Sequence, residues 1–195
     1  MRRRTFDALM VFAGLALAAI LLVAGVLLNW GHTFVNSEVH NQLASQQIYF
    51  PTTSNPEFKA LPAADAAAMK PYAGQLMTTG AQAEAYADHF IAFHLSKMGG
   101  TYSQLSAKAM AAPKNTQLAG LVATVFKGTT LRGMLLNAYG FWKLGAIAGI
   151  AAIFAFAGAA LMLILSFAGL WHLRRVPESS EVLAKISHAS QVQTA

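Results

Sequence analysis

The sequence predicts an all-α membrane protein with two transmembrane helices and a small, mainly helical extracytoplasmic domain between them. Of its 195 residues, 55% are hydrophobic and only 11% are charged, whereas soluble domains carry about 25% charged residues. Two long runs without a charged side chain, residues 8–28 and 144–171, lie near the two ends of the chain. No alternating apolar and polar pattern of useful length indicates a β-strand.

The first run is long enough to cross a bilayer once. As a helix, residues 8–28 would be roughly 31 Å long, about the thickness of the hydrocarbon core. A cleaved signal peptide is the alternative, because three arginines precede the run and Ala16-Leu17-Ala18 resembles a cleavage site. That tripeptide lies inside the run rather than after it, so we favour a retained span.

The second run, residues 144–171, is longer than one crossing requires, so we expect this helix to tilt or to project beyond the bilayer. Aromatic side chains suited to the membrane–water interface flank both runs. They are Trp30, Phe34, Phe141, Trp142 and Trp171.

Basic residues next to the runs predict the orientation in the plasma membrane. Arg2, Arg3 and Arg4 precede the first run, and Arg174 and Arg175 follow the second. Because basic residues favour the cytoplasmic side, we expect both termini in the cytoplasm. The expected parts are an N-terminus at 1–7, spans at 8–28 and 144–171, an extracytoplasmic domain at 29–143 and a cytoplasmic, disordered tail at 172–195.

Small residues in the two spans predict close helix packing. Gly145 and Gly149 form a GxxxG pair, and Gly14 with Ala18 offers a similar face in the first span. The alternative is that small residues are simply frequent in an Ala-rich membrane protein. Neither run contains an ionisable residue, so the usual marker of a transporter, pump or channel is missing.

The middle segment reads as a series of helices. Val35, Val39 and Leu43 recur at four-residue spacing, so we expect the first span to continue as a helix above the membrane until the stretch Ile48-Tyr49-Phe50-Pro51, where the proline ends it. Residues 51–77 contain four prolines and predict an irregular connection with a short turn at Ala63 to Met69.

Two capping boxes then predict helix starts. The pair Thr79 and Gln82 opens a helix that we expect to end at Gly99-Gly100, and Thr101 with Gln104 opens one that Pro113 closes. Leu118 to Phe126 shows the spacing of a core-facing stripe. We expect that helix to stop at Gly128 and another to begin near Thr130 and lead into the second span.

The remaining composition excludes several classes of site. The sequence has no cysteine, which removes disulfides, thiol nucleophiles and thiolate zinc sites. The net charge of +6 does not come from one basic stripe, so no nucleic-acid partner is expected. Glycine loops that bind phosphate and the G-x-S-x-G serine motif are absent from the sequence, and we expect no cofactor.

One helix carries residue types that could bind a metal. Asp88, His89 and His94 supply the two histidines and one carboxylate of a non-haem iron site. On a helical wheel, however, Asp88 and His89 lie near the solvent side, while His94 points into an apolar arc. The favoured interpretation is an amphipathic helix with solvated Glu84, Asp88 and His89, and with His94 as a hydrogen-bonded core residue.

Two stretches carry a family resemblance. AEAYADHFIAFHL and LRGMLLNAYGF, together with the WHLRR that follows the second run, resemble small two-pass membrane proteins of actinobacteria without an established function. The resemblance covers most of residues 6–175. It implies a two-pass membrane protein, and the label of some members, aromatic ring-opening dioxygenase, implies an enzyme.

These observations lead to the expectation of a non-enzymatic membrane protein. It would act as an accessory or assembly factor that binds other membrane or envelope proteins, self-association included. A membrane-anchored, metal-dependent enzyme of dioxygenase type centred on Asp88, His89 and His94 is the competing class. An envelope sensor that reports the state of the outer domain to the tail is a third.

Overall fold

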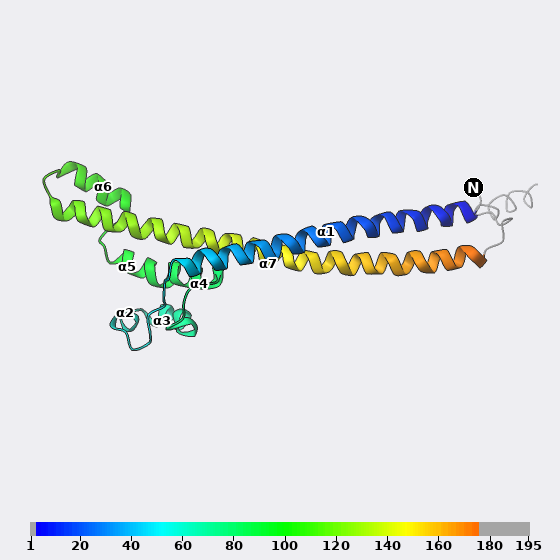
Figure 1. The fold of residues 1–195 in the computed structure, drawn as a ribbon. Helices are drawn as coiled ribbons and strands as arrows, with labels where there is room; N and C mark the ends of the chain where they lie inside the picture. Colours follow the sequence, from blue (N-terminus) through cyan, green and yellow to red (C-terminus); the bar gives the residue numbers. More distant parts are fainter. Residues whose placement is uncertain (1–2, 176–195) are drawn as a thin grey trace, which may run out of the picture. The chain divides into compact units, whose positions relative to one another are not determined.

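Two long helices contain both apolar runs, and short helices lie between them in the chain (Figure 1). The computed structural model describes residues 3–175, so the expected disordered tail at 176–195 lies outside the described residues. Among residues 3–175 there is no strand, only an isolated bridge between Tyr49 and Leu76. The prediction of a helical protein is confirmed.

The helices are labelled in chain order. They are α1 (Arg3–Ser45), α2 (Pro56–Lys59), α3 (Ala63–Met69), the 3-10 turn η1 (Lys70–Tyr72), α4 (Gly80–Ala85), the π-helix η2 (Tyr86–Ile91), α5 (Ala92–Ser96), α6 (Tyr102–Ala111) and α7 (Thr116–Arg175). Both α1 and α7 are long and apolar enough to cross a membrane.

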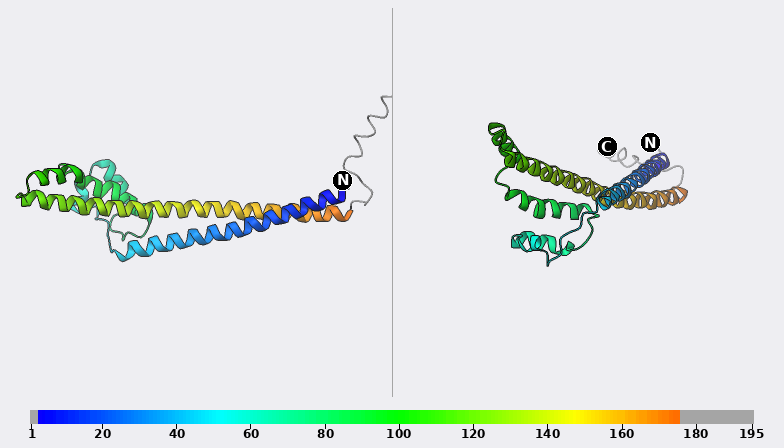
Figure 2. Two further views of the ribbon diagram at one scale, coloured as in Figure 1. Left: turned by 90° about the horizontal axis from the view of Figure 1, so that it is seen from above. Right: turned by 60° about the vertical axis from the view of Figure 1, so that its left-hand side comes forward.

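The chain divides into two compact units. The helix-pair unit comprises Met1–Trp30 and Ala148–Ala195, and the middle unit comprises Gly31–Ile147. Figure 2 shows α1 and α7 from two further directions.

Within the helix-pair unit, glycines bring α1 and α7 into close contact. A methyl group added at Gly14 would lie 2.5 Å from Oγ of Ser166, and one at Gly169 would lie 2.6 Å from Cγ2 of Val11. Val11 of α1 meets Gly169 of α7, whereas Gly14, further along α1, meets Ser166, earlier in α7. The two segments are therefore antiparallel. Small buried residues fill the rest of this contact: Ala18, Ala152, Ala155 and Ala159.

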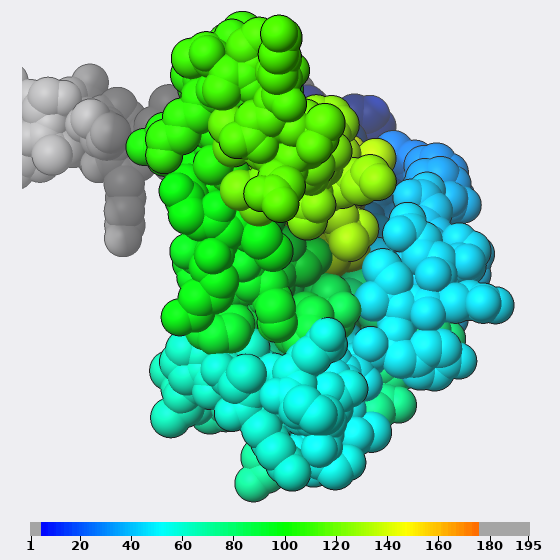
Figure 3. All heavy atoms as spheres, turned by 90° about the vertical axis from the view of Figure 1, so that its left-hand side faces the viewer, coloured from blue at the N-terminus to red at the C-terminus, as the bar shows by residue number. Residues whose placement is uncertain are grey.

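The core of the middle unit draws one or more apolar residues from almost every helix. Leu43 of α1, Phe58 of α2, Met69 of α3, Ala87 of η2 and Leu135 of α7 are buried together. Each short helix is too short to be stable alone, so these contacts are what hold it. Figure 3 shows one face of this unit, on which the cyan segment with α2 and α3 lies beside green segments.

Backbone hydrogen bonds fix the irregular connection to the end of α1. The amide of Phe50 donates to the carbonyl of Gln75 at 2.9 Å, and the amide of Met77 donates to Ile48 at 2.9 Å. Gly74 adopts φ +74°, which favours glycine. The first span continues as a helix above the apolar run, as predicted, and ends at Ser45, just before the expected stretch at 48–51. Gln47 follows the helix with a positive φ of 53°.

Both predicted capping boxes are confirmed. The Thr79 side chain accepts from the amide of Gln82, and Thr101 does the same for Gln104, each with the reciprocal bond present. These starts were predictable because the interaction lies within four consecutive residues.

The predicted helix stop at Gly128 is wrong, because α7 continues without a break from Thr116 to Arg175. Leu95 packs against this glycine, and a methyl group added at Gly128 would lie 2.8 Å from Cδ2 of Leu95. The residue therefore makes room for α5 rather than ending a helix.

A close contact between α4 and α7 gives the first prediction. A methyl group at Gly80 would overlap with Cβ of Trp142, an atom that side-chain rotation cannot move away. We expect Gly80→Ala to lower the free energy of unfolding by about 1–3 kcal/mol through overpacking, measured by denaturation of the purified protein. Gly120→Ala is the matched control, since Gly120 has nothing within 4 Å of the added group and should gain about 0.5–1 kcal/mol. Equal effects of the two changes would contradict this packing.

Candidate functional site

The helix that carries Asp88, His89 and His94 changes its winding at Tyr86–Ile91. These six residues form the π-helix η2 between α4 and α5. A π-helical turn is rare and often occurs at functional sites. We therefore treat η2 and the side chains around it as the candidate site.

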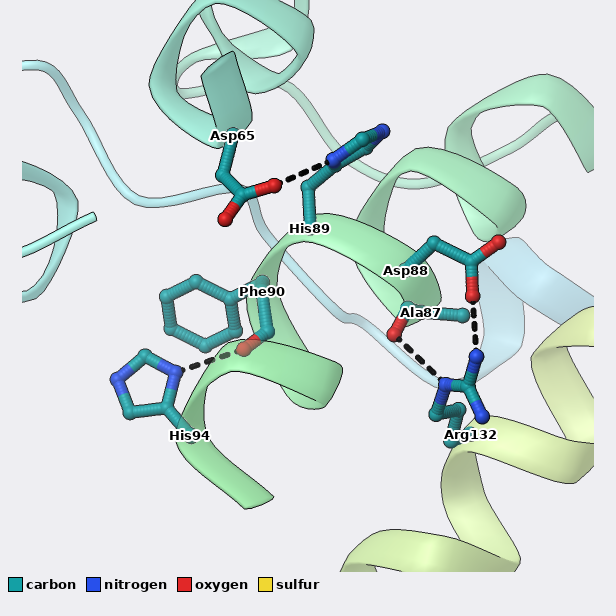
Figure 4. A network of polar contacts seen from close by, with 7 residues as sticks. All are labelled: Asp65, Ala87, Asp88, His89, Phe90, His94 and Arg132. Atoms are coloured by element: carbon teal, nitrogen blue, oxygen red, sulfur yellow. Dashed lines mark hydrogen bonds and ion pairs between the residues drawn. The ribbon is translucent and has the colours of Figure 1, made fainter. Parts of the chain in front are cut away.

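Arg132 of α7 binds η2 at two points. Its Nη2 donates to Oδ1 of Asp88 at 2.6 Å, and its Nε donates to the carbonyl of Ala87 at 3.2 Å (Figure 4). Because the Arg132 and Asp88 side chains are 39% and 36% exposed, water screens much of their attraction. The guanidinium of Arg132 nevertheless fixes the position of η2 against α7, because it donates to two groups at once. A lysine ammonium would lack this fixed two-point geometry.

His89 joins η2 to α3. Its Nδ1 lies 2.8 Å from Oδ1 of Asp65, and both side chains are about one-third exposed or less. Since the carboxylate only accepts, Nδ1 carries the proton of this bond.

The ring of His94, in α5, makes a hydrogen bond to the backbone of the adjoining η2. Its Nδ1 donates to the carbonyl of Phe90 at 2.8 Å, and its ring lies 4.4 Å from the Phe90 ring centroid. The Phe93 ring meets it edge-on at 5.3 Å. The side chain is half-buried rather than fully enclosed in the core.

The three proposed metal ligands do not meet at a common point. Asp88 points to α7, His89 points to α3, and His94 lies at the other end of the stretch (Figure 4). Within residues 3–175 no group of three or more His, Cys, Asp or Glu side chains is placed to hold a metal ion. The arrangement instead links three elements that are far apart in the sequence.

Tyr86 begins an aromatic row at the head of η2. Its ring meets Phe50 edge-on at 5.3 Å and Phe90 at 4.8 Å. Burial raises the pKa of Tyr86 above its ordinary value, and the negative charge of Glu57 raises it further. The hydroxyl therefore stays neutral near pH 7 and suits a packed position.

Two of the glycines predicted to pack against another helix, Gly14 and Gly145, lie in contacts between α1 and α7 of this chain. A methyl group added at Gly145 would lie 3.1 Å from Cγ1 of Val35, and His32 donates to the carbonyl of Gly145 at 2.8 Å. Ala18 is fully buried, and Gly149 is half-buried in α7. With Gly14 against Ser166, the residues Gly14, Ala18 and Gly145 lie in the contact between α1 and α7.

Sequence reasoning missed three charged residues of interest. Asp65 and Arg132 are the partners of His89 and Asp88, yet they lie 24 and 44 residues away along the chain. No local pattern could have paired them. Asp7 was missed because it directly precedes the charge-free run.

No protein-family model, curated protein or solved structure matches the chain. The resemblance to two-pass actinobacterial proteins thus stays a prediction.

The double contact of Arg132 gives the second prediction. We expect Arg132→Ala to destabilise the protein by about 1–2 kcal/mol, because the buried carbonyl of Ala87 loses its side-chain donor and Asp88 loses its partner. Lys127→Ala, at an exposed position of the same helix, should stay within about 0.5 kcal/mol of the parent. Denaturation midpoints of both variants decide this, and equal midpoints would show that the double contact contributes nothing to stability.

Proposed function

We propose that the chain is a two-span plasma-membrane protein that acts as a non-enzymatic accessory or assembly factor. In this proposal both termini are cytoplasmic and the middle unit is extracytoplasmic. Only 17% of the most apolar window of each long helix is buried within the chain. A soluble protein would not leave two such windows facing water, which supports a bilayer around them.

An apolar groove in the middle unit carries the proposal. It lies between residues 34–46, at the end of α1, and residues 134–141 of α7, and has a volume of about 540 Å³. Met134 and Phe141 line it and are 63% and 61% exposed, and Leu135 closes its floor. Large exposed apolar and aromatic side chains of this kind concentrate binding energy in protein interfaces.

The occupant that fits best is an amphipathic helix of another membrane protein. Two antiparallel helices form the walls, and a third helix can complete their packing by placing its ridges in the groove between them. The polar residues Glu38, Gln42 and Asn137 border the apolar floor. Glu38 is exposed and accepts a hydrogen bond from Gln42 at 3.3 Å, so a basic residue on the rim of the partner helix would complement it.

The position of the groove favours a membrane partner. Its first wall residue, Phe34, follows the span expected at 8–28 by less than two helical turns, and Phe141 precedes the second run by less than one turn. A segment that leaves the bilayer beside this chain would reach the groove without a long linker. That geometry suits an assembly factor, which must hold a neighbouring subunit next to the membrane.

A charge placed in the groove tests the proposal. We expect Met134→Asp to lower partner binding about tenfold or more, because the docked partner would bury an unpaired carboxylate. The matched control is Met110→Asp, since Met110 is also exposed (74%) but lies on α6. Binding is measured by photo-crosslinking from position 141 in intact membranes, followed by identification of the crosslinked peptide.

The crosslinked peptide should belong to a helix of one defined membrane protein, and the amount of adduct should fall about tenfold or more in Met134→Asp alone. An adduct that persists in Met134→Asp, or one that both variants lose, would overturn the groove as the binding surface. An adduct between two copies of this chain would replace a separate partner by self-association.

A further inference from the structure

A second groove lies in the helix-pair unit and contains an unpaired acidic oxygen. Asp7 of α1 lines it, and Oδ2 of this residue is buried without a hydrogen-bond partner among the described residues. A buried carboxylate oxygen without a donor is costly, and native proteins provide a partner for nearly all such atoms. The site therefore calls for a ligand that brings an N–H or O–H donor and a positive charge.

The groove beyond Asp7 is apolar and about 500 Å³ in volume, within the size range of small-ligand sites. It extends along α1 as far as Leu17 and along α7 from His172 to Met162. Ten helical residues span about 15 Å, roughly half the hydrocarbon thickness. The groove is thus as deep as one leaflet, with its charged end at the membrane boundary.

The rim of the groove indicates a flexible chain rather than a packed helix. Met10, Leu17 and Leu165 line it and are 59%, 45% and 54% exposed. Helices that pack closely in membranes meet through small residues, but here the small residues Gly14 and Gly169 are already occupied by the contact between α1 and α7. Long apolar side chains at an open rim suit an acyl chain.

The charges at the mouth suit a zwitterion. His172 lines the groove, and Arg174 and Arg175 complete the basic last turn of α7. Cations in this turn can attract a phosphate, while Asp7 requires a cation. A phospholipid whose headgroup carries both a phosphate and a primary ammonium satisfies both demands, and its ammonium has N–H donors that a quaternary ammonium lacks.

We propose that this groove binds one phospholipid with a primary-ammonium headgroup, with the ammonium donating to Asp7 and an acyl chain lying between α1 and α7. The site rests on the proposed membrane location of the two helices but is independent of the partner groove in the middle unit. It would place a specific lipid at the cytoplasmic end of the helix pair.

The test uses the full-length protein, extracted in mild detergent and mixed with phosphatidylethanolamine and phosphatidylcholine of identical acyl chains. Lipid retained after purification is quantified by mass spectrometry. Wild type should retain phosphatidylethanolamine about tenfold over phosphatidylcholine, the effect of one charge-assisted hydrogen bond. Asp7→Asn should abolish the preference, and the control Glu84→Gln, an acid of the middle unit, should preserve it.

A second variant keeps the test decisive if Asp7→Asn folds poorly. Leu17→Trp fills the apolar end of the groove and should lower retention of both lipids while Asp7 is intact. Equal retention of the two lipids by wild type would overturn the proposal, as would a preference that survives in Asp7→Asn. A membrane protein that co-purifies with the wild type and is lost from Asp7→Asn, with lipid retention unchanged, would overturn the proposal and assign the groove to a basic helix instead. Recovery of the protein without detergent would refute the membrane location itself.

Discussion

The close antiparallel contact between α1 and α7 is the constraint on which the remaining structure depends. Within the helix-pair unit it relies on Gly14, Gly169 and buried alanines, and within the middle unit on Gly145 against Val35. Small residues allow the two backbones to approach, which is the main source of helix association in a bilayer, where burial of apolar surface from water contributes little. Residues of both helices line each of the two grooves.

Polar side chains then position the short helices against α7 and against each other. Arg132 reaches from α7 to Asp88 and the carbonyl of Ala87, and His89 reaches from η2 to Asp65. Asp88 and His89 are residue types that often occur in catalytic sites, but each binds a partner on a different helix: Asp88 binds Arg132 of α7, and His89 binds Asp65 of α3. Their hydrogen bonds are therefore better explained as contacts that hold η2 against α3 and α7.

The sequence was sufficient for features set by local interactions and insufficient for those set across the fold. Capping at Thr79 and Thr101 involves neighbouring residues, and both helix starts were correctly predicted. The stop at Gly128 failed because Leu95, distant in sequence, uses the glycine as a packing site. The helical wheel assumed a constant 3.6 residues per turn, so it could not foresee η2. The orphaned oxygen of Asp7 likewise depends on a helix that returns about 160 residues later.

The proposed function requires that the middle unit and the C-terminal tail lie on opposite sides of the membrane. The chain has no cysteine, so single cysteines can report this directly. Thr53→Cys, at an exposed position of the middle unit, and Ser180→Cys in the tail are treated in intact cells with a membrane-impermeant maleimide. The account predicts labelling of Thr53→Cys before lysis and of Ser180→Cys only after it. Labelling of both positions before lysis, or of Ser180→Cys alone, would contradict the two-span arrangement.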